Sequence, residues 1–213
     1  VTDLNPEYAD GHNNLGVILQ DLGKFDESID SFKRALFLKP NYPEAYNNLA
    51  ITYRENKKYK KSVNFFNKAI SLNPNYAEAF NNLATTLKEQ GKTNEAIELF
   101  KKAISLKPNY AEVYYNIGNV LKDQSDFDTA IENYKNALKF NPEYVEVFNN
   151  LATALKDKGD FYSAIINYQE ALRIKPDFVE AYNNMGNTFQ ENGDFFDGLK
   201  AFKNALRLKP DYL

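Results

Sequence analysis

Two kinds of apolar pattern alternate along the chain, and each has the spacing of one face of an α-helix. In the stretch 77–89 the apolar residues are Phe80, Leu83, Ala84 and Leu87, which follow the i, i+3, i+4, i+7 spacing. A second apolar set with helical spacing follows at 96–104. The two sets together predict a pair of amphipathic helices joined by a short turn.

This pair of patterns recurs six times with a period of 34 residues. A short exact period is typical of proteins in which each repeat packs only on its neighbours, without one central core. The predicted units are 9–42, 43–76, 77–110, 111–144, 145–178 and 179–212. Residues 1–8 match the end of a preceding unit, since Leu4, Pro6 and Tyr8 correspond to Leu38, Pro40 and Tyr42.

Glycine and proline mark the boundaries of the predicted helices. Between the two helices of a unit lie Gly23, Gly91, Gly159 and Gly193, with Lys57 and Ser125 in the other two units. Glycine is favoured there because it adopts the left-handed conformation that ends a helix. Seven of the eight prolines are spaced by 34 residues and separate one unit from the next, because proline cannot continue a helix. They are Pro6, Pro40, Pro74, Pro108, Pro142, Pro176 and Pro210.

Small and large residues recur at fixed positions, numbered from the first residue of each unit. Position 8 is always Gly or Ala, position 20 is Ser, Ala or Gly, and position 27 is always Ala. Position 24 always carries an aromatic ring: Phe32, Phe66, Phe100, Tyr134, Tyr168 and Phe202. Small residues facing large ones predict helices that interlock closely.

This pattern resembles the tetratricopeptide repeat, which has the same 34-residue period and the same small, aromatic and proline positions. The resemblance covers residues 9–212, and it implies an all-α fold: a right-handed α-solenoid of six helix-turn-helix units. Runs such as Tyr182-Asn183-Asn184-Met185-Gly186-Asn187 are also similar to the repeats of O-linked N-acetylglucosamine transferases. That resemblance implies, as an alternative function, a substrate-recruiting arm of a glycosyltransferase whose catalytic domain lies outside this chain.

Composition excludes several classes of protein. Without cysteine the chain has no disulfide and no thiol chemistry, and its net charge of −3 gives no reason to expect a nucleic-acid partner. No apolar run approaches the length that spans a bilayer, and the first residues do not resemble a signal peptide, which favours a cytoplasmic location without membrane contact. The single histidine, His12, occupies an aromatic core position. We therefore expect no enzyme, no metal and no cofactor.

Asparagine forms the strongest functional signal. Position 6 is Asn in all six units, and position 5 is Asn in every unit except the fourth, which has Tyr115. Asn in a helix interior costs roughly 0.5–0.7 kcal/mol relative to Ala, so its repetition indicates a compensating role. In the resembling family the first helices line the concave surface, which implies a ladder of amides that grips the backbone of an extended peptide. The predicted peptide-binding residues are Asn14, Asn48, Asn82, Asn116, Asn150 and Asn184, with Asn13, Asn47, Asn81, Tyr115, Asn149 and Asn183.

Other interpretations of these columns stay open. The position-6 amides could instead bond the neighbouring helix, and the high asparagine content of the chain, 28 residues, could by itself enrich position 5. A short row of lysines at position 12, Lys88, Lys122 and Lys156, could receive acidic groups of a ligand, although an acidic residue follows each of them. A solvated surface of mixed charge is the other explanation of that row, and the adjacent acids favour it.

The predicted function is non-catalytic binding of a protein or an extended peptide. A second alternative comes from the ends of the array, where no additional polar helix follows Pro210. Leu199, Phe202, Leu206 and Leu208 would then be uncovered, and end-to-end self-association would bury them. The partial unit at 1–8 and this uncovered end suggest an excerpt from a longer protein.

Overall fold

The computed structural model describes residues 8–211, and these form twelve α-helices and no β-strand. The predicted partial unit at 1–8 lies outside the described residues except for Tyr8. The helices are α1 (Ala9–Asp21), α2 (Phe25–Leu38), α3 (Pro43–Glu55), α4 (Tyr59–Leu72), α5 (Ala77–Glu89), α6 (Thr93–Leu106), α7 (Ala111–Asp123), α8 (Phe127–Phe140), α9 (Val145–Asp157), α10 (Phe161–Ile174), α11 (Val179–Asn192) and α12 (Phe195–Leu208).

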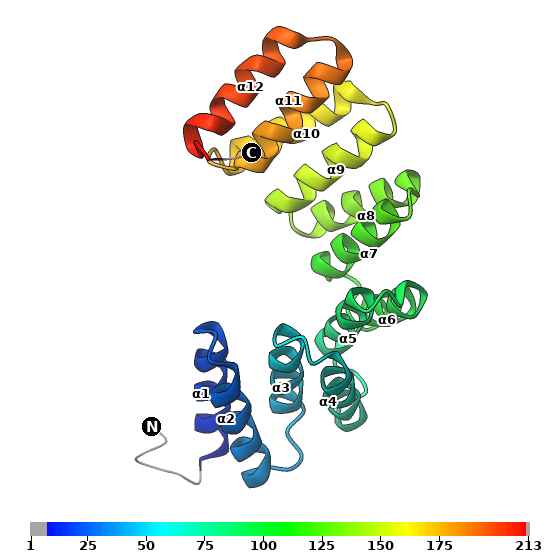
Figure 1. Ribbon diagram of the computed structural model, residues 1–213. Helices are drawn as coiled ribbons and strands as arrows, with labels where there is room; N and C mark the ends of the chain where they lie inside the picture. The colour runs from blue at the N-terminus through cyan, green and yellow to red at the C-terminus, as the bar shows by residue number, and fades with distance from the viewer. Residues whose placement is uncertain (1–7, 212–213) are drawn as a thin grey trace. The chain divides into compact units, whose positions relative to one another are not determined.

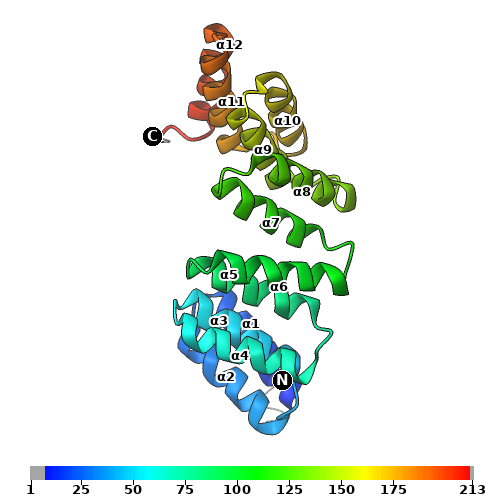
Figure 2. The same ribbon diagram turned by 90° about the vertical axis from the view of Figure 1, so that its right-hand side faces the viewer.

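Consecutive helices pair as six antiparallel hairpins, as the 34-residue pattern predicts (Figure 1). In both views α5 and α6, for example, lie side by side along their length (Figure 2). The hairpins divide into two compact blocks of three, Val1–Pro108 and Asn109–Leu213, which we call the N-terminal and C-terminal blocks. The prediction of an all-α chain of six helix-turn-helix units is confirmed.

The turn inside each hairpin has the left-handed residue that the glycine pattern predicts. All six turn residues have positive φ, including the two that are not glycine, Lys57 at 55° and Ser125 at 61°. In the first turn the amide of Gly23 donates to the carbonyl of Gln20 at 2.8 Å, and the amide of Lys24 donates to that of Leu19 at 2.9 Å. These bonds satisfy carbonyls that the end of the helix would otherwise leave without a donor.

Each hairpin is held together by the aromatic ring at position 24. Phe32, Phe66, Phe100, Tyr134 and Tyr168 are completely buried. In the fourth unit the ring of Tyr134 lies so close to Gly118, at position 8, that a Cβ atom on this glycine would stand 2.6 Å from the ring. Gly16 is equally close to Phe32, at 2.7 Å. The small residues at position 8 therefore set the distance between the two helices.

The two serines at position 20, on the second helix of the first and second units, differ in their hydrogen bonds. Ser28 is buried, and its hydroxyl donates to the carbonyl of Gly16 at 2.8 Å. Ser62 is equally buried, but its Oγ finds no hydrogen-bond partner in the structure. A buried polar group without a partner costs about 1–3 kcal/mol.

We predict that Ser62→Ala raises the free energy of unfolding by about 1 kcal/mol, because it removes a polar group that is buried without a partner. Alanine already occupies this position in the third to fifth units. The matched variant Ser28→Ala should lower stability by about 1 kcal/mol, because it breaks a satisfied hydrogen bond. Urea unfolding followed by circular dichroism measures both, and a shift of the two midpoints in the same direction would contradict the prediction.

Candidate functional site

The first helices of the hairpins form one surface in each block. In the N-terminal block α3 contacts both α1 and α5, and in the C-terminal block α9 contacts α7 and α11. Among the described residues of each block, the second helices contact first helices but not one another. Each block is therefore packed more tightly on the side of its first helices, which makes this first-helix face the concave side of the block.

The two asparagine columns lie on this face at different depths. At position 5 the side chains are buried: Asn81 is 1% exposed and Asn149 is 2% exposed, and Asn13 and Asn47 are buried as well. Asn183, at the same position, is half-buried. The position-6 side chains lie nearer the surface: Asn14 is exposed, whereas Asn48, Asn82, Asn116, Asn150 and Asn184 are half-buried. The structure thus separates the predicted ladder into an inner and an outer column.

Hydrogen bonds between successive units connect the two columns. The outer Asn48 donates from Nδ2 to Oδ1 of the inner Asn13 at 3.2 Å. The outer Asn82 donates in the same way to Asn47 at 3.1 Å, and Asn184 donates to Asn149 at 3.2 Å. Each pair is separated by 35 residues, so position 5 of one unit meets position 6 of the next. In these pairs the position-6 amides therefore bond the neighbouring helix, as the alternative interpretation expects.

Further bonds continue the network within a helix and toward position 2. Asn149 donates from Nδ2 to Oδ1 of Asn150 at 3.3 Å and to Oε1 of Glu180 at 3.3 Å. A carboxamide offers two N–H donors and an oxygen with two lone pairs. The outer asparagines are thus fixed in orientation by their neighbours, while an outer amide such as Asn82 uses one of its N–H groups in the bond to the preceding unit.

Tyr115 takes the place of an inner asparagine in the fourth unit. Its hydroxyl accepts from Nδ2 of Asn150 at 3.1 Å, which preserves the bond between successive units. The same Nδ2 also donates to Oδ1 of Asn119 at 2.9 Å, and the hydroxyl of Tyr134 donates to that oxygen at 2.8 Å. Burial raises the pKa of both Tyr115 and Tyr134, so both hydroxyls stay protonated.

The cluster around Asn119 lies outside the predicted columns, although the sequence contains a signal for it. Position 24 is Tyr only in the fourth and fifth units, and position 9 is polar in both, with Asn119 and Thr153. The hydroxyl of Tyr168 lies 3.0 Å from that of Thr153. Position 9 is also polar in the third and sixth units, where the ring at position 24 is a phenylalanine, so the tyrosine is the part of the signal that marks the cluster. A buried tyrosine hydroxyl needs a partner, and position 9 supplies it.

The lysine row at position 12 is paired with acids at its C-terminal end. Nζ of Lys156 lies 3.2 Å from Glu191 in the next unit and 3.3 Å from Asp157. Burial acts to lower the pKa of Lys156, but the bonds to these two carboxylates raise it overall. Lys88 and Lys122 are half-buried on α5 and α7. At Lys156, therefore, the row joins adjacent units as part of a mixed-charge surface.

The acids at position 2 also have partners that the sequence pattern does not reveal. These acids lie in the first turn of a helix, where the helix dipole favours negative charge, so their presence could be explained without any partner. In the structure Oε1 of Glu78 accepts from Nζ of Lys107 at 2.8 Å, and Asp10 lies 3.8 Å from Lys39. The bond from Lys107 holds the pKa of Glu78 below its usual value. These pairs link the start of a hairpin to its end, across 29 residues for the Glu78 pair.

Metal-binding and membrane-spanning features are absent from the described residues. Within residues 8–211, no three side chains of His, Asp or Glu are grouped so that they could hold a metal ion. In the same part of the chain, every helix is too short or too polar to cross a membrane. His12 is half-buried on α1.

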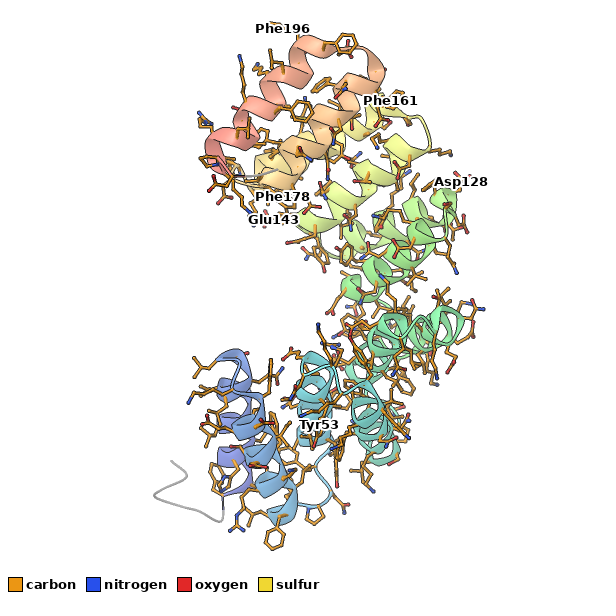
Figure 3. The ribbon with its side chains drawn as sticks, in the orientation of Figure 1. Tyr53, Asp128, Glu143, Phe161, Phe178 and Phe196 are labelled. Atoms are coloured by element: carbon orange, nitrogen blue, oxygen red, sulfur yellow. The ribbon has the colours of Figure 1, made fainter. Side chains whose placement is uncertain are left out.

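The side of α12 that faces away from α11 is apolar and exposed. Phe196 is 82% exposed and points outward at the end of the hairpin, as Figure 3 shows. Leu199 is 53% exposed, whereas Ile131, at the same position two units earlier, is 8% exposed. Leu206 and Leu208 are exposed and Phe202 is half-buried, in line with the sequence expectation for this face.

A chain of helical hairpins, each packed on the next within its block, defines a helical repeat protein. More specifically, the chain belongs to the tetratricopeptide repeat family. A family model described as TPR repeat matches residues 85–125, 118–159 and 152–193, which together make up half of the chain. Models described as tetratricopeptide repeat match 9–42, 43–76, 65–98 and 179–212. No curated protein sequence matches the chain.

Solved structures share this fold at low sequence identity. The crystal structure of the APC/C hetero-tetramer Cut9-Hcn1 is similar over 100% of this chain, with a TM-score of 0.84 and 16% identity, and this chain spans 42% of that one. The crystal structure of MamA is similar over 76% of this chain and 95% of its own, with a TM-score of 0.70 and 26% identity.

A third similar structure is that of YrrB, described as a TPR protein with an unusual peptide-binding site. It covers 84% of this chain and 93% of its own, with a TM-score of 0.61 and 22% identity. At this identity the likeness shows the fold alone. The narrower resemblance to O-linked N-acetylglucosamine transferase repeats stays a prediction.

We predict that Asn119→Val lowers the free energy of unfolding by about 1–3 kcal/mol, because the buried hydroxyl of Tyr134 then loses its acceptor. The double variant Asn119→Val, Tyr134→Phe recreates the Val17–Phe32 pairing of the first unit and should recover most of this loss. Urea unfolding of the two single variants and the double variant measures the coupling. Additive losses in the double variant would contradict the assignment.

Proposed function

We propose that the chain is a non-catalytic binding protein that holds an extended peptide along its first-helix face. The observation that carries this proposal is the outer asparagine column on the concave side of each block, where Asn48, Asn82 and Asn184 are half-buried and oriented by bonds to the neighbouring unit. Groups that are already oriented lose less conformational freedom on binding. The same amides that join the units are thus suited to meet a ligand.

The outer and inner columns have different roles in this proposal. The inner asparagines, which are buried, orient the outer ones and do not meet the ligand directly. The second N–H group of an outer amide and its oxygen can pair with the carbonyl and N–H groups of a peptide backbone. Because every peptide carries these groups, the face would bind by conformation more than by side-chain sequence. The similarity to YrrB, which is described as having a peptide-binding site, supports this use of the fold.

The lysine row contributes charge at the edge of the same face. Lys156 is already paired with Glu191 and Asp157, so an acidic ligand would have to replace those contacts. In this proposal Lys88, Lys122 and Lys156 therefore tune the binding of acidic side chains, while Asn82, Asn116 and Asn150 bind the backbone.

An array of dodecapeptides probed with the labelled full chain tests this function and supplies a peptide for affinity measurements. We expect Asn48→Ala, Asn82→Ala, two changes within the N-terminal block, to weaken the affinity for the best peptide of that block by roughly tenfold or more, since two backbone contacts are lost. The control variant Asn67→Ala, Asn136→Ala changes two asparagines of the second helices and should bind as the unchanged chain does.

The double variant also breaks bonds between units, so its folding must be measured separately. Circular dichroism melting shows how much of each variant is folded at the temperature of the binding experiment. Asn14→Ala supplies a further check, because Asn14 is exposed and its replacement leaves the asparagine bonds between units intact. Unchanged affinity in a folded Asn48→Ala, Asn82→Ala variant, and in the equivalent Asn150→Ala, Asn184→Ala variant of the C-terminal block, would refute the proposal.

The exposed face of α12 favours a second candidate function, end-to-end self-association. Leu199 lies exposed where the equivalent Ile131 is covered in its own block. The complementary surface is α1, where Ile18 is 57% exposed although position 10 is buried in every later unit. A contact between α12 of one copy and α1 of another is heterologous and would repeat from copy to copy.

Sedimentation velocity at increasing protein concentration tests this second candidate. We expect the mass of the sedimenting species to rise with concentration, and Leu199→Lys to suppress the rise by placing a charge in the buried contact. Lys200→Ala, a change at the neighbouring exposed position, should have little effect. A monomer at every concentration would exclude self-association.

A further inference from the structure

The turn of the second unit differs in charge from the five other turns. The stretch 54–63 contains five basic residues and one acidic residue. The equivalent stretches 20–29, 88–97, 122–131, 156–165 and 190–199 contain at most two basic residues and never fewer acidic than basic ones. We call Arg54, Lys57, Lys58, Lys60 and Lys61 the basic turn. Its charge is a local departure from the repeat in a chain of net charge −3.

Little in the structure neutralises this charge. Lys57, Lys58, Lys60 and Lys61 are all exposed, and among the described residues no carboxylate lies within 4 Å of Lys57 or Lys60. An ion pair of the turn joins Lys58 to the exposed Asp26 at 3.9 Å. The one acid of the turn, Glu55, already accepts from Nε2 of Gln20 at 3.0 Å. Like charges held together in this way attract an anionic partner.

Lys57 has a backbone conformation that is unfavourable for a residue with a side chain. Its φ is 55°, and four of the other turns place glycine at this point. A residue with a side chain in the left-handed region costs roughly 1–2 kcal/mol. The turn thus keeps a cation at a place where glycine would be more stable.

The basic turn also surrounds a shallow depression. Residues 57–61 and Asn64 line a concavity of about 570 Å³. Nζ of Lys61 lies 5.5 Å from the centre of the ring of Tyr53, close enough for a cation–π contact that favours one position of this lysine. The surface therefore combines cations from a single turn with a recess that can receive side chains.

We propose that the basic turn binds an acidic peptide segment, at a site separate from the first-helix face. The extent of the charge favours a peptide over a nucleic acid or a membrane. The equivalent turns of the first and third units, in the same block, have net charges of −2 and 0. A nucleic acid presents a continuous line of phosphates, and an anionic membrane presents a plane of them, so both favour basic surfaces that extend further. A few consecutive carboxylates match a single basic turn.

Fluorescence anisotropy with a labelled octapeptide of alternating aspartate and glutamate tests the site in the full chain. The charge-reversal variant carries Lys58→Glu, Lys60→Glu and Lys61→Glu, and we expect it to bind at least tenfold more weakly. A variant with glutamine at the same three positions should bind with an affinity between those of the unchanged chain and the charge-reversal variant. Lys57 stays unchanged in both, so that the left-handed turn is preserved.

The matched control carries Lys101→Glu, Lys102→Glu and Lys203→Glu, which change the net charge equally at exposed positions elsewhere. It should bind the octapeptide within about threefold of the unchanged chain, because exposed charges that lie far apart are screened by salt. An octapeptide of alternating asparagine and glutamine should not bind. Equal losses in the control and charge-reversal variants would overturn the proposal, because the attraction would then come from net charge alone.

Two other probes distinguish the classes of partner. A single-stranded oligonucleotide and vesicles containing phosphatidylserine should bind more weakly than the acidic octapeptide. Tighter binding of either probe, abolished by the charge-reversal variant, would overturn the assignment to a peptide. The outer asparagine variants should leave octapeptide binding unchanged, so the result is independent of the function proposed for the first-helix face.

Discussion

The structure depends first on the contact between the ring at position 24 and the small residue at position 8. In the fourth unit Tyr134 approaches Gly118 so closely that even a methyl group would collide with the ring. This contact fixes the spacing of the two helices in a hairpin, and it brings the apolar positions of both helices together. Every hairpin has Gly or Ala at position 8, and within a block each first helix meets its neighbour in the same register. The bonds between asparagines 35 residues apart follow from that register.

Stability and binding are connected on the first-helix face. The inner asparagines are buried and would be costly if they lacked partners, and the outer asparagines supply those partners from the next unit. An asparagine that looks unfavourable within one helix is therefore favourable within an array. The same bonds leave the outer amides in fixed positions near the surface, where they can meet a ligand. A column of one residue type thus meets a structural requirement and provides the basis of the proposed site.

Much of the fold could be predicted because each signal is repeated six times. The helices, the left-handed turns and the small residues beneath the rings all follow from local rules of backbone and packing. The partners of individual side chains could not be predicted, because they depend on how one hairpin is rotated against the next. The bond of Asn150 to Tyr115 and Asn119 is an example, since these residues are 35 and 31 positions away. The basic turn emerges only when the six turns are compared in register.

The 35-residue separation of the bonded asparagines determines how such an array can change length. The acceptor at position 5 and the donor at position 6 belong to different units, and within each block the later unit carries the donor for the unit before it. Removing the whole unit 43–76 would place Asn82 where Asn48 now meets Asn13. Loss of this complete unit would thus leave Asn13 with a donor from the next unit, and in the C-terminal block Tyr115 provides the acceptor in the same way. Gain and loss of whole units by recombination is therefore compatible with these bonds, because each unit carries both the acceptor position and the donor position.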